Sequence, residues 1–235
     1  MTAHDILQQL EALGTEQTRK TFRNHGAPDP LFGVKVGDMK TITKKVKKNH
    51  ALSLEVYASG NPDAQYFAAL IADERQITSA QLHEWAQTAS WHMVSEYAVA
   101  AVAAESPHGW ALGLQWIESP EEKIAAAGWS TLGYWVMLRP DAELDKEALR
   151  QLLQRVEHTL HQSANRVRYT MNGFIIALGS AVPVLTPLAV ETAQKLGTVS
   201  VFMGKTACKV PEATAYIEKV HAAGKAGAKR KMARC

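Results

Sequence analysis

The sequence has few of the features that mark secreted, membrane or metal-binding proteins. Only two cysteines occur in 235 residues, Cys208 and Cys235, and they stand too far apart for a metal or redox motif. No apolar run reaches the length of a membrane span, because Glu105 ends the longest one. The N-terminus has no basic flank before an apolar segment, so a signal peptide is not expected. These absences favour a reduced, cytosolic protein.

Signals for β-strands are also scarce, and nearly every segment has the pattern of a helix. Only TVSVF at 198–202 alternates β-branched residues as a strand does. Helix starts are clear, since Asn61-Pro62-Asp63 combines an N-cap residue, a proline and an acid. The sequence predicts thirteen helices, near residues 2–13, 15–24, 36–49, 51–59, 62–74, 78–88, 90–104, 107–118, 120–138, 142–160, 163–180, 183–196 and 211–223.

The loops between these helices are short, and many contain proline or glycine. Short connections make consecutive helices neighbours, and helix pairs recurring at intervals of about 30 to 44 residues indicate an α-solenoid of HEAT-like repeats. The predicted fold class is therefore all-α, with a compact irregular bundle as the alternative. No linker divides the chain, so residues 1–223 are expected to form one domain, followed by a basic tail over 224–235.

The net charge of +3 conceals an uneven distribution. Residues 35–48 hold six lysines and one acid, and residues 219–235 hold six basic residues and no acid. Positive charge therefore collects near the two ends of an acidic chain, a pattern that suits polyanion binding. Each patch alone is also compatible with a solvated helix or a frayed tail.

Three candidate sites have little support. GKT at 204–206 lacks the earlier glycine of a phosphate-binding loop, because Val199 stands there. His158 and His161 have no further ligands nearby and are expected at a helix end rather than on a metal. Cys208 is expected to be a small buried thiol.

One charge interrupts the apolar stretch ASWHMVSEYAV at 89–99. Glu96 is the only charged residue between positions 93 and 104, and a buried carboxylate is costly unless it is paired. Three interpretations stay open: a structural ion pair, a narrow solvent-facing strip, or a carboxylate that lines a concave site. On a helix His92 would share a face with Glu96, and Trp91 would lie beside them.

A polar stripe marks a later apolar helix. Asn165, Arg168 and Asn172 recur at helical spacing, and Arg166 is adjacent to the stripe. Since solenoid repeats place corresponding helices side by side, Glu96 and Arg168 are expected to face one groove. A carboxylate, a guanidinium and aromatic rings in one groove suit a phosphodiester or a nucleobase.

The segment SWHMVSE at 90–96 resembles the active-site helix of the AlkD-like DNA alkylation repair proteins, which are HEAT-like bacterial DNA glycosylases. The resemblance runs from GVKVGDMK at 33–40 to the C-terminal helix. It aligns Trp91 and His92 with two tryptophans of the family. It aligns Glu96 with the family's catalytic aspartate.

Two other family positions differ in this chain. The family's catalytic arginine aligns with Ala126, and a further tryptophan aligns near Phe174. One aromatic residue of the family's groove is therefore kept as an aromatic, and the arginine is absent. Arg168 is the candidate to replace it from a neighbouring helix.

The resemblance implies hydrolysis of the N-glycosidic bond of a cationic alkylated purine in double-stranded DNA. It implies a monomer without metal or cofactor, in the bacterial cytosol or nucleoid. Glu96 would stabilise the charge that develops on the deoxyribose, assisted by His92. Substrate contacts are expected from Trp91, Trp129, Phe174 and Asn172. Phosphate contacts are expected from Lys44, Lys45, Lys47, Lys48, Arg166, Arg168, Lys205 and Lys209.

Two alternatives from other functional classes remain. Ala126, in the place of the family's arginine, favours a non-catalytic solenoid that recognises distorted or branched DNA by shape. Most HEAT-like solenoids are protein-interaction scaffolds, which is the second alternative. Salt-sensitive DNA binding without base release would indicate the first, and absence of DNA retention would indicate the second.

Overall fold

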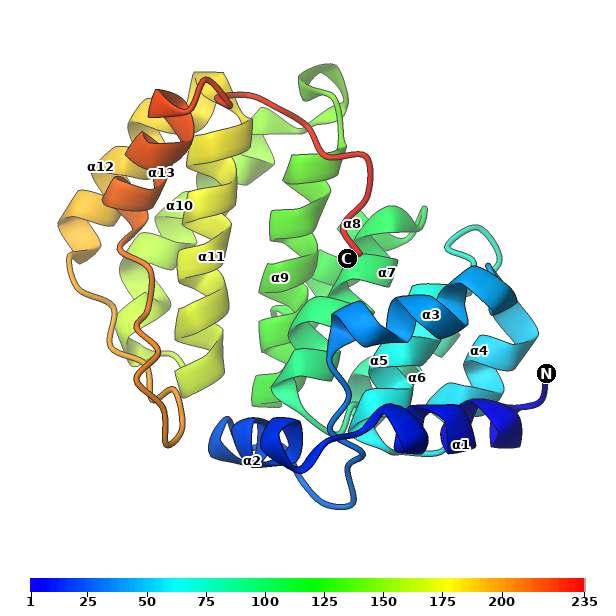
Figure 1. Cartoon of the computed structure of the whole chain (residues 1–235). Coiled ribbons are helices and arrows are strands. Elements are labelled where there is room, and N and C mark those ends of the chain that lie inside the picture. The colour runs from blue at the N-terminus through cyan, green and yellow to red at the C-terminus, as the bar shows by residue number, and fades with distance from the viewer. Residues whose placement is uncertain (235) are drawn as a thin grey trace.

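The computed structural model describes residues 1–234, and in that part the chain forms helices without any strand (Figure 1). A π-helix, Val94–Val99, leads directly into α7. The α-helices of the described part are α1 Ala3–Leu13, α2 Glu16–Asn24, α3 Val36–Val46, α4 His50–Tyr57, α5 Pro62–Ile71, α6 Ser79–Thr88, α7 Ala100–Glu105, α8 Gly109–Trp116, α9 Glu122–Leu138, α10 Lys146–Thr159, α11 Asn165–Ala181, α12 Thr186–Leu196 and α13 Ala213–Ala222.

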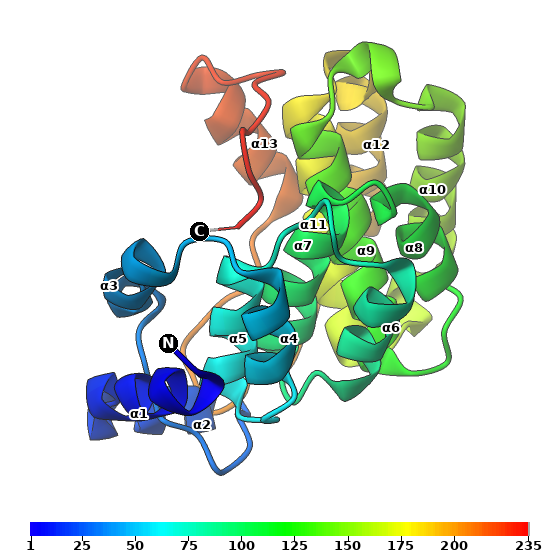
Figure 2. The same cartoon turned by 90° about the vertical axis from the view of Figure 1, so that its right-hand side faces the viewer.

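Two layers of helices build the molecule. The inner layer runs in the order α3, α5, the π-helix with α7, α9, α11 and α13, and each member packs against the next. Helices α4, α6, α8, α10 and α12 cover its outer side (Figures 1 and 2), while α1 and α2 lie across the end that is lowest in Figure 1. Helix pairs stacked side by side in this way form an α-solenoid, so the predicted fold class is confirmed.

Every helix predicted from the sequence is present, with ends that differ by a few residues. Local capping explains why the starts were predictable. Asn61 Oδ1 accepts hydrogen bonds from the N–H groups of Asp63 and Ala64, and Pro62 occupies the first turn of α5.

The one strand-like run, 198–202, lies in the irregular segment between α12 and α13. The side-chain amide of Asn165 makes the two backbone hydrogen bonds that a neighbouring strand would make in a sheet. Its Oδ1 accepts from the N–H of Phe202 at 2.7 Å, and its Nδ2 donates to the Phe202 carbonyl oxygen at 2.9 Å. Residues 197–212 are called the α12–α13 loop below.

Apolar side chains from both layers fill the interior in two clusters that divide near the contact of α8 with α9. Trp116 and Trp129 are among the largest fully buried side chains. Gly128 lets the two helices approach, because a Cβ atom there would lie 2.7 Å from the Ile117 backbone nitrogen.

A buried carboxylate ties the segment before α3 to the inner layer. Asp63 is 3% exposed and accepts hydrogen bonds from the backbone N–H groups of Phe32, Gly33 and Val34, at 2.7, 2.9 and 2.8 Å. A buried carboxylate that accepts several backbone donors is compensated for its lost hydration. This contact fixes α2 and α3 relative to α5.

The C-terminal residues 225–234 cross the carboxyl ends of inner helices, and Figure 1 shows them passing α11 and α9. The backbone N–H groups of Gly227 and Arg230 donate to the carbonyl oxygens of Ser180 and Met137, both at 2.8 Å. The sequence set this segment apart as a tail, whereas the structure packs it against the helices. We call residues 225–234 the C-terminal strap.

Candidate functional site

Glu96 lies in the π-helix of the inner layer and is 2% exposed. Inserted π-turns are rare and occur often at functional sites. Burial raises the pKa of Glu96 to about 7, although hydrogen bonds from a guanidinium oppose that rise. The side chain is therefore inside the protein and not in a solvent-facing strip.

The guanidinium of Arg166, at the start of α11, pairs with Glu96 through two hydrogen bonds. Nε donates to Oε1 at 2.8 Å, and Nη2 donates to Oε2 at 2.5 Å. The Arg166 side chain is 14% exposed, and its guanidinium lies 4.3 Å from the centre of the Tyr169 ring. Both carboxylate oxygens are thus occupied, as a structural ion pair requires.

The structure corrects the predicted roles of two arginines. Arg168 was expected to share a groove with Glu96, and Arg166 was expected to contact phosphate. Residues two positions apart on a helix point to different sides, so only one of them turns toward the π-helix. Arg166 takes that position, while Nη2 of Arg168 donates to Asn165 Oδ1 at 3.4 Å.

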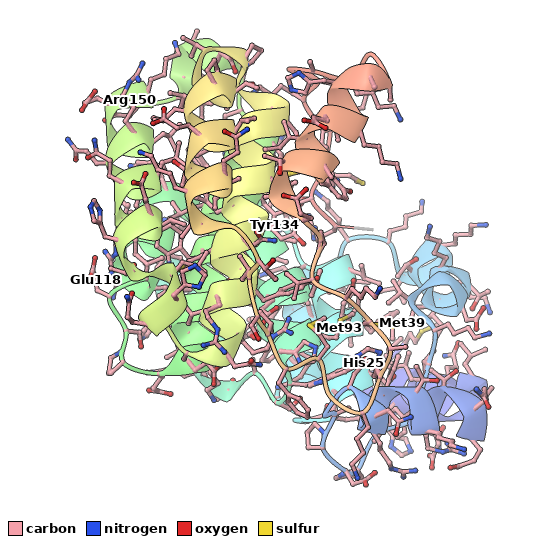
Figure 3. The ribbon with its side chains drawn as sticks, turned by 90° about the vertical axis from the view of Figure 1, so that its left-hand side faces the viewer. His25, Met39, Met93, Glu118, Tyr134 and Arg150 are labelled. Carbon is pink, nitrogen blue, oxygen red and sulfur yellow. The ribbon has the colours of Figure 1, made fainter. Side chains whose placement is uncertain are left out.

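Helix α2 and the α12–α13 loop cover the ion pair. Trp91 is 9% exposed, and its Nε1 donates to the carbonyl oxygen of His25 at 3.1 Å. The N–H of Lys205 donates to the carbonyl oxygen of Asn24 at 2.8 Å, which joins the loop to α2. Figure 3 shows His25 and Met93 next to this loop.

The loop also touches the ion pair itself. Arg166 Nη1 lies 3.7 Å from the sulfur of Met203. Sγ of Cys208 lies 3.9 Å from Nε2 of His25, and Cys208 is exposed, so the expectation of a buried thiol was wrong. Within the described part of the chain, Glu96 is thus turned toward Arg166 in the interior and not toward the open groove that the sequence predicted.

His92 is held neutral by its surroundings. Burial lowers its pKa to about 3, and the positive charge of Arg166 and the neighbouring His25 add to that effect. Its ring lies against Trp91 with the centroids 5.0 Å apart. No hydrogen bond links His92 to Glu96 among the described residues, so the predicted assistance to a catalytic carboxylate stays a prediction.

We expect His92→Gln to reduce the acid sensitivity of the protein. Folding lowers the pKa of His92 from 6.5 to about 3, so between these pH values the unfolded chain binds a proton that the folded protein does not. The free energy of unfolding therefore decreases as pH falls from 6.5 toward 3. The loss is up to about 1.4 kcal/mol per pH unit, or about 2 kcal/mol between pH 6.5 and 5. Urea unfolding of both proteins at pH 7 and pH 5 measures it. An equal pH effect in the variant and the unaltered protein would contradict the assignment.

Three residues expected to contact substrate belong to the packed interior. Trp129 and Phe174 are completely buried and meet edge to face, with ring centroids 5.3 Å apart. Asn172 is 2% exposed, and its Nδ2 donates to the carbonyl oxygen of Pro211 at 2.9 Å. Large aromatic rings at the contact of α9 with α11 are used for packing, which corrects their predicted role as walls of an open site.

The lysines predicted to contact phosphate stay at the surface. Lys44, Lys45 and Lys47 are exposed and form no ion pair within the described part. Lys48 is exposed but its Nζ bonds both oxygens of Glu74, at 2.5 and 2.6 Å. The remaining two, on the α12–α13 loop, are exposed: Lys205 and Lys209.

The family model for "DNA alkylation repair enzyme" matches residues 6–217. The chain belongs to the DNA alkylation repair enzyme family. The uncharacterized protein Lin0241 of Listeria innocua is 37% identical over 225 residues, which cover 93% of this chain and 97% of that protein. The uncharacterized protein Lmo0209 of Listeria monocytogenes matches with the same identity and coverage.

A solved structure of the same architecture superimposes with a TM-score of 0.92. It is 36% identical to this chain, and the match covers 100% of both chains. It is described as one of "a new family of proteins related to the HEAT-like repeat DNA glycosylases with affinity for branched DNA structures". The family that the segment at 90–96 indicated is therefore confirmed.

Ala126 stands at the position that the resemblance aligns with the catalytic arginine of the DNA alkylation repair family. It is completely buried in the core between α9 and its neighbours. The arginine nearest to Glu96 in the described part is the one that pairs with it, Arg166. That pair was missed because the sequence shows a helical stripe but not which neighbour of the stripe turns inward.

The described part of the chain offers no metal site and no single membrane-spanning helix. No group of three or more histidine, cysteine, aspartate or glutamate residues is arranged to hold a metal ion. No single helix of the described part is long and apolar enough to cross a membrane. One sharply bent pair, α11 with the 183–196 segment, has the length and composition of a membrane span, and no other feature supports that role.

Proposed function

We propose that this protein binds branched DNA through exposed basic side chains and does not hydrolyse the glycosidic bond. The pairing of Glu96 with Arg166 carries the proposal. A glycosylase carboxylate must approach the deoxyribose to stabilise its positive charge. Glu96 is 2% exposed, and both its oxygens are bonded to Arg166, so it is unavailable for that task in this conformation.

The related structure of 36% identity supports the choice of partner, because that protein is described as having affinity for branched DNA. Exposed lysines in α3 and after it supply the positive charge that phosphate binding requires. Shape and backbone charge are sufficient to hold a junction without base-specific contacts.

Glycosylase activity is the second candidate, and one observation favours it. The resemblance aligns Glu96 with the family's catalytic aspartate. Glu96 lies in a π-helix, and burial raises its pKa to about 7. Perturbed carboxylates of this kind gather at active sites. For catalysis α2 and the α12–α13 loop would have to separate from the inner layer.

Binding and base release distinguish the two candidates. Fluorescence anisotropy compares a four-way DNA junction with a linear duplex of equal length, at several salt concentrations. We expect the junction to bind more tightly, with affinity that falls as salt rises. Alkylated DNA is then assayed for free 7-methylguanine and 3-methyladenine. If the unaltered protein releases either base and Glu96→Gln does not, the non-catalytic proposal is overturned. If the protein binds none of these DNAs, the scaffold alternative is favoured.

A further inference from the structure

The two basic segments of the sequence, 35–48 and 219–234, meet at one carboxylate. Glu74 accepts from Lys48 Nζ at 2.5 and 2.6 Å and from Arg234 Nη2 at 2.6 Å. Arg234 also donates through Nε to Oε2 of Glu105 at 2.7 Å. The charges of the two cations and the two carboxylates cancel, so this network needs no other lysine. It holds the end of the C-terminal strap beside the start of α4.

The position of the strap is set by its own basic side chains. Arg234 Nη1 donates to the carbonyl oxygens of Ala69 and Ala72, at 2.9 and 2.7 Å, where α5 ends. Lys229 Nζ donates to the carbonyl oxygen of Val136 at 2.9 Å, in the last turn of α9. The final carbonyl groups of a helix lack partners and carry negative partial charge, so cations are favoured there.

The other basic residues of the two segments remain available to an external anion. Figures 2 and 3 show α3 and α13 on the same side of the inner layer, which is the side toward the viewer in Figure 1. The exposed members that form no ion pair in the described part are Lys35, Lys40, Lys44, Lys45, Lys47, Lys219, Lys225, Arg230 and Lys231.

The exposed cations nearest to the network lie close enough for one ligand. A chain of four residues spans at most about 14 Å, so Lys44 and Lys48 are no farther apart than that along the backbone. Arg230 and Arg234 are also four residues apart, so the same maximum distance applies to them. Duplex DNA carries about one phosphate per 1.7 Å of axis. A stretch of duplex about 14 Å long therefore offers several phosphates to the lysines of α3 and to the cations of the C-terminal strap at the same time.

We infer that α3 and the C-terminal strap form one phosphate-binding surface for a duplex arm, assembled by Arg234 as a positioning residue. This inference rests on the proposed DNA binding and names the surface that performs it. Neither basic segment would be expected to hold the duplex as well alone, since loss of either removes contacts from the same arm. The two basic segments therefore act together in space, although about 170 residues separate them in the sequence.

Two double variants of the full chain test the surface with a four-way DNA junction as probe. Lys44→Ala with Lys45→Ala removes two charges from α3. Arg230→Ala with Lys231→Ala removes two charges from the strap. We expect each to lower junction affinity about ten-fold and to reduce the slope of log affinity against log salt by about 2, because each lost phosphate contact contributes about 0.9.

A matched control removes two charges from the outer layer. Lys146 and Arg150 are exposed on α10, and Figure 3 shows Arg150 on the opposite side from α3. Lys146→Ala with Arg150→Ala changes the net charge equally and is expected to leave the salt slope unchanged. If the α3 and strap variants bind the junction as this control does, the surface is wrong while DNA binding stands. If the unaltered protein binds no DNA, the proposed function fails first.

Arg234→Gln tests the positioning role. We expect it to lower the salt slope by about as much as Arg230→Ala with Lys231→Ala, because the strap no longer holds its cations in place. Adding those two substitutions to Arg234→Gln should cause no further loss of affinity, whereas adding Lys44→Ala with Lys45→Ala should. Full additivity with the strap variant would show that Arg234 does not position it. The two double variants decide the surface even if Arg234→Gln folds poorly.

Discussion

Arg166→Met is expected to destabilise the protein by about 3–5 kcal/mol at neutral pH, because it leaves the carboxylate of Glu96 unpaired inside the inner layer. Methionine fills a similar volume without offering a donor. Neither oxygen of Glu96 has another partner among the described residues, so the structure cannot compensate locally. Guanidinium or urea unfolding followed by circular dichroism measures the change.

The double variant Glu96→Leu with Arg166→Met serves as its control. Replacing both members of a buried ion pair by apolar residues is often neutral or stabilising. We therefore expect the double variant to recover most of the stability that Arg166→Met loses. A double variant as unstable as the single one would mean that packing, and not the unpaired charge, causes the effect.

The same pair predicts a pH dependence. Burial already raises the pKa of Glu96 to about 7, and removal of Arg166 takes away the effect that opposes this rise. A carboxylate with a raised pKa in the folded state contributes stability below its unfolded pKa, 4.5, and loses it as pH rises through the folded value. The deficit of Arg166→Met should therefore continue to grow above pH 7, and the double variant should not show this growth.

Local chemistry explains why the helices could be predicted. Helix starts such as Asn61-Pro62-Asp63 are determined within four residues, and the structure uses the same atoms that the sequence indicates. The cost of a lone buried charge is also local, which is why Glu96 was identified as needing a partner. The identity of that partner depends on the rotation of α11 against the π-helix, and sequence spacing gives no information on it.

Contacts between distant segments account for the remaining differences. Trp129 and Phe174 meet across α9 and α11, and this contact removes both rings from the surface. Asn165, read as part of a polar stripe, instead bonds the backbone of Phe202. The C-terminal strap has a composition typical of a solvated tail, and it is packed because Glu74, Glu105 and the last carbonyl groups of α5, α9 and α11 lie where its donors can reach them.

Membership of the DNA alkylation repair family does not by itself determine the chemistry of this chain. The inner layer supplies a rigid row of helices, and its function depends on which side chains reach the surface. In this chain Glu96 and Arg166 pair in the interior, while exposed basic side chains lie on α3, the α12–α13 loop and the C-terminal strap, among other segments.

Arg234→Ala is expected to destabilise the protein by about 3 kcal/mol, although it lies next to the last residue of the chain. The Arg234 side chain is 8% exposed and bonds two carboxylates and two carbonyl oxygens. Its removal leaves the carboxylate of Glu105 without its cation in a side chain that is 9% exposed. Arg234→Lys keeps the charge but cannot reach all these acceptors, so we expect an intermediate loss.

Lys231→Ala is the matched control, since Lys231 is an exposed cation of the same strap with no ion pair in the described part. It should change the free energy of unfolding by less than about 0.5 kcal/mol. Hydrogen exchange locates the effect: in Arg234→Ala the N–H groups of Gly227 and Arg230 should lose protection together, because the strap detaches as a unit. Equal unfolding free energies for the two variants, with both N–H groups still protected, would mean that Arg234 does not hold the strap to the solenoid.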